Sequence, residues 1–244
     1  QTKLLAQLEI TKTDGSVQTI VSDESWGWSN DGPIRFADNK DGEIVDDNCQ
    51  PSYCGKAKRT HHKATPTASN NVPVVEKERF SARKILTPSG KTVLDFGQNI
   101  AGYVSFRCNA KAGQKITLRF GEMLDQNGEF TQENFQLTMG KKTTPLQKVE
   151  YTCKEGLNEY KTTFAVFGFQ YALVEADFEI DPSDFTSIAV YSDLEQIGFF
   201  DCSHPLINRL VDATIWSAKG NHLDVPTDCP TRERHAWTGD AQIF

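Results

Sequence analysis

Short runs of alternating apolar and polar residues dominate most of this chain and limit what it can fold into. The alternation recurs at 103–108 and 114–120, and a turn at Ala112-Gly113 precedes the second run. An Asp14-Gly15 pair lies between apolar runs at 4–10 and 17–21, which is typical of a β-hairpin. Period-two runs joined by Gly, Asn and Asp turns, with little helical periodicity, predict a mainly β fold of antiparallel β-sandwich domains.

Two longer segments extend this pattern. Residues 92–96 lead through the Gly97–Gly102 segment to the run at 103–108. Residues 164–174 read as one long aromatic strand, in which Gly168 is expected to mark a bulge or kink.

The pattern changes at two places along the chain. Residues 49–76 are polar, basic and rich in Thr and Ser, and the His61-His62 pair there is read as linker rather than metal ligand. Beyond residue 192, apolar residues recur at helical spacing and predict an amphipathic helix over 204–219, with Ser203 as N-cap and Pro205 in the first turn. A second helix is expected to begin near Thr238 or Asp240. A lone helix cannot bury both of its faces, so a third domain is expected to continue beyond these residues.

Composition excludes several classes of function. The net charge is −7 with no basic stripe, so nucleic acid and anionic membranes are not expected as partners. The six cysteines lack zinc-ligand spacing, and neither a metal nor a cofactor is expected. Cys49 and Cys54 are either bridged or reduced, which leaves the compartment open, with a secreted or periplasmic location favoured over the cytoplasm. The first residues resemble a strand rather than a signal peptide, as expected of a mature form or a fragment.

Two polar segments allow alternative readings. Trp26 and Trp28 lie beside a polar turn, where they either cover a sandwich core, the commoner case, or form a sugar-stacking platform. The acidic stretch 38–47 lacks the register of an EF-hand loop, so a solvated acidic turn is favoured over a calcium site.

The last residues of the chain are rich in acidic, basic and aromatic side chains. Pro230 and Gly239 favour a loop there. Acids, cations and an aromatic side chain on one loop are suited to cleaving a sugar bond. The residues in question are Asp228, Arg232, Glu233, Arg234, Trp237 and Asp240.

Residues 228–241 (DCPTRERHAWTGDA) closely resemble the signature of bacterial α-L-rhamnosidases, glycoside hydrolase family 78. Segments 4–10, 38–46, 94–103 and 167–171 agree with that family in the same order. The resemblance implies the later part of a jelly-roll-like N-terminal β-sandwich plus linker at 1–76, a concanavalin-like β-sandwich at 77–195, and the start of an (α/α)6-barrel at 196–244. Many members carry one more acidic residue before the glutamate, whereas here the acid, Glu233, lies five residues after Asp228.

The resemblance also implies a reaction, the inverting release of terminal α-L-rhamnose from polysaccharides or glycosides. Glu233 would be the general acid, and Asp228, Arg232, Trp237 and Asp240 would bind the sugar. The general base would be a glutamate beyond residue 244, about 6.5–9.5 Å from the acid. These residues alone are therefore expected not to hydrolyse rhamnosides.

Three alternatives remain beside this hypothesis. Glu233 would simply pair with Arg232 and Arg234 on a surface loop. The chain would be a non-catalytic carbohydrate-binding module that uses Trp26 and Trp28. Or it would belong to a related (α/α)6 glycosidase or phosphorylase of different specificity. Linkage preference and oligomeric state are left open by the sequence.

Overall fold

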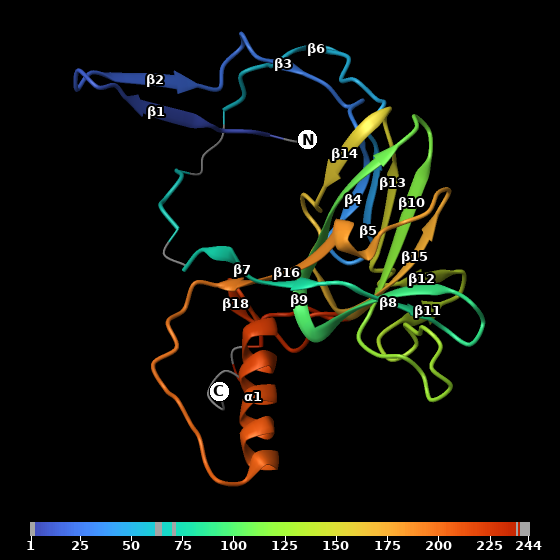
Figure 1. The fold of residues 1–244 in the computed structure, drawn as a ribbon. Helices are drawn as coiled ribbons and strands as arrows, with labels where there is room; N and C mark the ends of the chain where they lie inside the picture. The colour runs from blue at the N-terminus through green and yellow to red at the C-terminus, as the bar shows by residue number, and fades with distance from the viewer. Residues whose placement is uncertain (1–2, 62–64, 70–71, 238, 240–244) are drawn as a thin grey trace. The chain divides into compact units, whose positions relative to one another are not determined.

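A computed structural model describes residues 3–61, 65–69, 72–237 and 239. The chain forms two compact units, drawn in Figure 1. The small unit comprises residues 1–33 and 49–69, and the large unit comprises 34–48 and 70–244. Residues 34–48 thus join the large unit, although the sequence suggested one contiguous domain over 1–76, because their strands pair within the large sheet. The three-domain division stays a prediction.

The small unit is built from two strand pairs. Strands β1 (Gln7–Thr11) and β2 (Val17–Val21) form the predicted hairpin, in register from Thr11 opposite Val17. Gly15 occupies its turn with a φ of +81°, which L side chains rarely adopt. The other pair is β3 (Gly27–Trp28) with β6 (Gly55–Lys56). Both strands of the hairpin are exposed along their whole length, so backbone pairing holds it rather than burial.

The large unit contains one curved sheet in the order β4-β5-β13-β10-β15-β9-β16-β7, with β8 and β14 also paired to β9. A small hairpin, β11 and β12, and the short 3₁₀ helix η1 lie outside it. The bounds are β4 Ile34–Asp38, β5 Gly42–Asp46, β7 Val74–Ser81, β8 Arg83–Leu86, β9 Thr92–Ala110, β10 Lys115–Gly121, β11 Leu137–Met139, β12 Lys142–Thr144, β13 Lys148–Thr152, β14 Gly156–Tyr160, β15 Phe167–Ala176, η1 Pro182–Asp184 and β16 Phe185–Ser192.

Strand β9 folds this sheet into two layers. It continues through the Gly97–Gly102 segment and joins the two predicted runs into one strand, pairing in turn with β8, β15, β16 and β14. The ring of Phe106 on β9 lies 5.2 Å from that of Tyr151 on β13, although two strands separate β9 from β13 in the sheet. The layers therefore face each other across an aromatic core, and the mainly β sandwich is confirmed. One pair, β5 with β13, is parallel.

Strand β15 carries aromatic residues toward that core. Phe167 and Phe169 are fully buried and both contact the ring of Phe120, at 4.6 and 4.9 Å between centroids. Because side chains alternate along a strand, Gly168 faces the opposite side. The predicted bulge at Gly168 is wrong: the register shift lies between Phe169 and Tyr171, and Gly168 pairs with Ala101.

The acidic stretch 38–47 is not a solvated turn. The side chain of Glu43 is 1% exposed, and its carboxylate accepts the backbone N–H groups of Thr163, Phe164 and Ala165 as well as the Tyr160 hydroxyl. A buried carboxylate requires such partners. Glu43 therefore ties β5 to the segment that leads into β15.

Helix α1 (Pro205–Gly220) agrees with the predicted helix, and Pro205 lies in its first turn. The predicted N-cap is wrong, because His204 occupies that position and makes no side-chain capping bond. The side-chain amide of Asn208 instead exchanges hydrogen bonds with the backbone of Cys202, which closes the turn before the helix. The helix contacts β9 and β16 (Figure 1).

Two short strands follow the helix, β17 (His222–Leu223) and β18 (Val225–Pro226), paired with each other. No helix in the described part of the chain combines the length and apolar character required to cross a bilayer.

Candidate functional site

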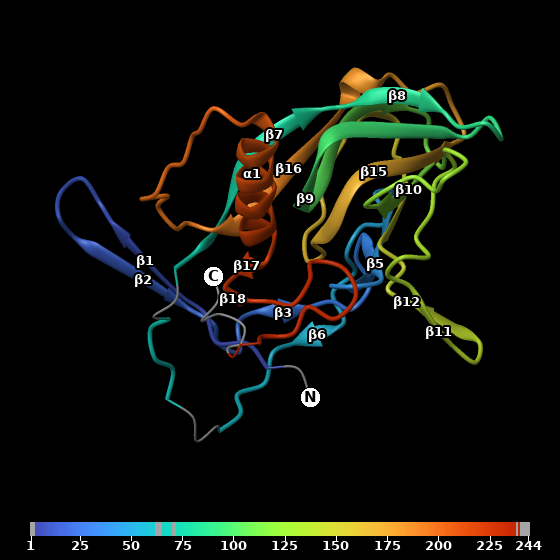
Figure 2. The ribbon, with the colours of Figure 1, turned by 90° about the horizontal axis from the view of Figure 1, so that it is seen from below.

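The segment after β18 forms a loop closed at its base. Thr227 and Ala236 form an antiparallel bridge, and the Trp237 N–H donates to the Pro226 carbonyl at 3.3 Å. Figure 2 shows this red segment beside the start of β15. We call residues 227–237 the motif loop. It presents Asp228, Arg232, Glu233 and Trp237 together, while Asp240 lies outside the described residues.

Asp228 organises the motif loop from within. Its Oδ1 accepts the His235 N–H at 2.8 Å, and its Oδ2 accepts the Cys229 thiol at 2.9 Å. The same sulfur accepts the Glu233 N–H at 3.3 Å. Partial burial acts to raise the pKa of Asp228, but the hydrogen bonds from Cys229 and His235 outweigh it and hold that pKa below its ordinary value. Asp228 is therefore ionised at neutral pH.

The side chains of Arg232, Glu233 and Trp237 are exposed, Trp237 to 50%. Within the described ranges, no ion pair joins Glu233 to Arg232 or Arg234, and no side chain bonds its carboxylate. Glu233 therefore does not form the surface ion pairs that the first alternative predicted. The carboxylate of Glu233 remains available to a ligand.

Arg234 turns away from Glu233 and into the sandwich. Its Nε donates to the Thr231 carbonyl at 3.1 Å, its Nη2 to Gln147 Oε1 at 3.0 Å, and its Nη1 to the Asn39 carbonyl. Burial lowers the pKa of Arg234 to about 10, so the guanidinium stays charged at neutral pH. Its φ of +56° is unusual for a residue with a side chain.

Beneath the motif loop, Gly168 provides a place where the backbone can be approached closely. A Cβ at this position would lie 2.6 Å from Thr231 Cγ2 and 2.9 Å from Pro230 Cγ. The buried amide of Gln147 holds the same residue, since its Oε1 accepts the Gly168 N–H at 3.1 Å and its Nε2 donates to the Gly168 carbonyl at 3.0 Å.

Sequence reasoning missed Gln147 and the role of Gly168. Gln147 has no neighbouring motif that would single it out. At Gly168 the sequence predicted only a bulge or kink, although a glycine between two large core residues is also a signal for close backbone approach.

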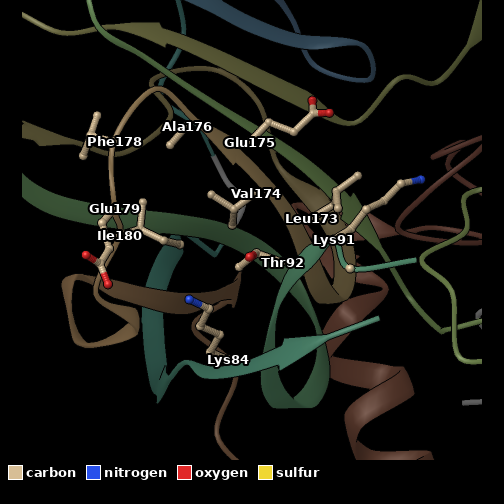
Figure 3. A pocket seen from close by; sticks show the side chains of 11 residues that line it. Lys84, Lys91, Thr92, Leu173, Val174, Glu175, Ala176, Phe178, Glu179 and Ile180 are labelled. Atoms are coloured by element: carbon tan, nitrogen blue, oxygen red, sulfur yellow. The ribbon is translucent and has the colours of Figure 1, made fainter. Parts of the chain in front are cut away.

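Two hollows elsewhere share no residue with the motif loop. One of about 380 Å³ is formed by the ends of β8, β9 and β15 and the segment after β15, with Lys84, Lys91, Glu175 and Glu179 around it (Figure 3). The other, of about 650 Å³ in the small unit, is lined by Trp26 and Tyr53.

The first hollow combines charges with apolar side chains and has no feature that indicates a reaction. In the small unit, Trp26 and Trp28 are 38% and 48% exposed, so they do not cover a core as the favoured reading predicted. Cys54 Sγ lies 3.1 Å from Asn30 Oδ1, and the structure contains no Cys49–Cys54 disulfide within its described part. The described residues contain no cluster of three metal-ligating side chains either.

Three domain families match consecutive parts of the chain. Residues 1–86 match the α-L-rhamnosidase N-terminal domain, 85–191 the bacterial α-L-rhamnosidase concanavalin-like domain, and 195–244 the bacterial α-L-rhamnosidase 6 hairpin glycosidase domain. The chain belongs to the bacterial α-L-rhamnosidase family. The last of these matches contains the whole motif loop, which agrees with the resemblance found in the sequence.

Individual α-L-rhamnosidases extend this result. The chain is 32% identical to a Formosa agariphila α-L-rhamnosidase and 33% identical to one from Alteromonas sp., in each case over 99% of this chain and 27% of the relative. The chain therefore spans about a quarter of the length of these curated relatives.

Solved α-L-rhamnosidase structures show the same fold. The enzyme from Aspergillus terreus matches with a TM-score of 0.87 and 33% identity over 98% of this chain and 29% of that one. The Streptomyces avermitilis enzyme, solved in complex with L-rhamnose, matches with a TM-score of 0.86 and 30% identity over 98% and 24%.

Proposed function

We propose that the whole protein containing this chain is an inverting α-L-rhamnosidase, in which Glu233 is the general acid. The arrangement of the motif loop carries the proposal: Glu233 is exposed, while the neighbouring cation of Arg234 is directed into the sandwich. A proton donor must be protonated as it meets the substrate, and an adjacent cation would favour its ionised form. The turned Arg234 removes one such cation. Relatives named α-L-rhamnosidase over the full length of this chain support the substrate class.

In this proposal the other motif residues hold the sugar. Arg232 donates charge-assisted hydrogen bonds to ring hydroxyls, and Trp237 offers its indole face to the apolar side of a deoxysugar. Asp228 and Asp240 accept hydroxyl protons. Asp228 has both oxygens engaged within the loop, yet a carboxylate offers about four lone pairs, so it still accepts from a ligand. The second carboxylate, acting as general base, lies outside these residues.

Replacing Glu233 by Gln tests the acid role. The amide keeps the shape but cannot transfer a proton, so turnover of a phenyl α-L-rhamnoside by the whole protein should fall about 10²–10⁴-fold. The 2,4-dinitrophenolate group of a 2,4-dinitrophenyl rhamnoside leaves without protonation. The rates of wild type and Glu233→Gln on this substrate should therefore differ far less than their rates on the phenyl rhamnoside. Both steady-state rates are compared with those of Glu133→Gln, an exposed carboxylate outside the motif loop. Equal losses on both substrates would remove Glu233 from the acid role.

A second function is favoured by one observation, the exposed Trp26 beside Tyr53 in the small unit. These rings suit a carbohydrate-binding surface that needs no catalysis. Calorimetry with rhamnose-containing oligosaccharides distinguishes the two, because binding by this surface is lost in Trp26→Ala and unaffected in Glu233→Gln.

A further inference from the structure

We propose that Gln147 and Arg234 are positioning residues, which anchor the motif loop to β15 of the sandwich and so set the place of the Glu233 carboxylate. This inference rests on the proposed function of Glu233. In this proposal the sandwich, which contributes no reacting group, determines the alignment of the proton donor.

The anchor begins in the core with Gln147, which is fully buried. Its Nε2 donates to the carbonyls of Phe120 on β10 and Gly168 on β15, at 3.2 and 3.0 Å. Its Oε1 accepts the Gly168 N–H at 3.1 Å. The side-chain amide is therefore fixed between two central strands and cannot turn without leaving buried polar groups unpaired.

Arg234 connects this fixed amide to the motif loop. Its Nη2 reaches the same Oε1 at 3.0 Å, and its Nε closes back on the Thr231 carbonyl at 3.1 Å. A third nitrogen reaches the Asn39 carbonyl in the turn between β4 and β5. One guanidinium thus joins the motif loop to two separate parts of the sandwich. A planar fork of fixed donors suits this task better than a lysine amine.

The backbone supports the same interpretation. Gln147 and Arg234 both adopt left-handed φ angles, +42° and +56°, which cost free energy for residues with a Cβ. Such conformations persist where surrounding contacts determine them, and here the two residues bond each other. Arg234 immediately follows Glu233, so the direction of the acid depends directly on how Arg234 is held.

Neither residue is placed to take part in the reaction. Gln147 is buried beneath the motif loop, and each of the three guanidinium nitrogens of Arg234 donates to an acceptor within the protein. An effect of either residue on turnover must therefore pass through the position of the motif loop that carries Glu233. A displacement of about 1 Å can reduce a rate about 10²-fold.

The test compares Gln147→Leu, Arg234→Met and Arg234→Lys in the whole protein, with Glu233→Gln in parallel. On a phenyl rhamnoside we expect the kcat of Gln147→Leu and of Arg234→Met to fall about 10²-fold, with KM nearly unchanged. On a 2,4-dinitrophenyl rhamnoside, which needs no acid, we expect less than about a threefold loss. Arg234→Lys should recover part of the rate. The double variant Gln147→Leu/Arg234→Met should be no slower than the slower single variant, because both changes break one connection.

Asn158→Leu is the matched control, since it also removes a buried amide with several hydrogen bonds but lies in β14, where it bonds the turn at the start of that strand. This variant should lower the melting temperature, but any loss of rate should be the same on the phenyl and the 2,4-dinitrophenyl rhamnoside. Equal losses on both rhamnosides in the Gln147 and Arg234 variants, or additive losses in the double variant, would overturn the proposal.

A second measurement separates this proposal from that of Glu233. If Glu233→Gln itself shows no leaving-group dependence, the acid assignment fails. The anchor is then decided by hydrogen exchange of peptides covering 227–237 in Gln147→Leu. Faster exchange there, with β9 unchanged, upholds the anchor, and unchanged exchange in the motif loop refutes it.

Discussion

Arg232 and Arg234 flank Glu233 in the sequence, and the fold gives them opposite surroundings. Arg232 is exposed beside the acid, whereas Arg234 is drawn into the sandwich and its pKa falls to about 10. The difference follows from the acceptors within reach: Arg234 meets the Gln147 amide and two backbone carbonyls. Residues of one type at nearly adjacent positions thus have different contacts.

Gly168 offers a test at the same scale. In Gly168→Ala the new methyl group would lie 2.6 Å from Thr231 Cγ2 and 2.9 Å from Pro230 Cγ, so the motif loop must move outward. We expect kcat of the whole protein on a phenyl rhamnoside to fall at least about tenfold. Adding Thr231→Ser removes the nearest atom and should restore part of the rate.

Gly198→Ala is the control for that experiment, because nothing lies within 4 Å of its added Cβ. Full activity of Gly168→Ala would show that Pro230 and Thr231 do not need to contact β15.

Helix α1 illustrates how one element depends on a few contacts at one end. The Trp216 ring packs edge-on against Phe80 at 5.7 Å, and Lys219 Nζ lies 2.7 Å from Glu78 Oε1 and 4.4 Å from the centre of the Trp216 ring. Its first half exposes Leu206 and Leu210. The last turns of the helix therefore carry its attachment to the sandwich, and β17 and β18 connect them to the motif loop.

Glu78 makes that attachment dependent on pH. Burial acts to raise its pKa, but hydrogen bonds from Lys219 and Tyr191 outweigh it, and the pKa lies below the ordinary 4.5. A carboxyl group whose pKa is lower in the folded state stabilises the protein at pH values above its unfolded-state pKa. This stabilisation disappears as the pH falls through the folded-state pKa.

Glu78→Gln should therefore reduce the free energy of unfolding by about 1 kcal/mol at pH 7, and the difference from wild type should shrink below about pH 4. Urea unfolding at several pH values measures this. A difference that is constant with pH would contradict an ionised Glu78 as the anchor of α1. Glu175→Gln, an exposed carboxylate on β15, serves as control.

Buried apolar side chains are distributed unequally between the two units. Among the described residues, every fully buried apolar side chain belongs to the large unit. The small unit holds its strands mainly through backbone pairing, and a two-stranded hairpin alone is marginally stable in water. The large unit instead packs two layers around its aromatic residues.

Hydrogen exchange of the 244-residue chain should reveal this inequality. Amides of β1 and β2 should exchange at least about a thousandfold faster than those in the centres of β9 and β15, because the latter open only with the core. Mass spectrometry of peptides from each strand provides the measurement. Comparable protection in β1–β2 and β9 would mean that the small unit is stabilised by more than its own pairing.

Local features of the fold follow directly from the sequence. Period-two runs located most strands, Asp14-Gly15 located the hairpin turn, and Pro205 with apolar residues at helical spacing located α1. These signals arise between residues close together in the chain. The linear spacing of the motif also placed Asp228, Arg232, Glu233 and Trp237 on one loop and indicated the family.

The contacts that support that loop depend on the folded arrangement of distant segments. Arg234 bonds Gln147 from 87 positions away, and Glu43 bonds the backbone of residues 163–165 from 120 to 122 positions away. The close approach of Pro230 and Thr231 to Gly168 likewise joins distant segments. Such contacts leave no periodic or local signal, because they exist only after β10, β13 and β15 have come together. The motif names the groups of the candidate site, and the packing of the sandwich fixes where they point.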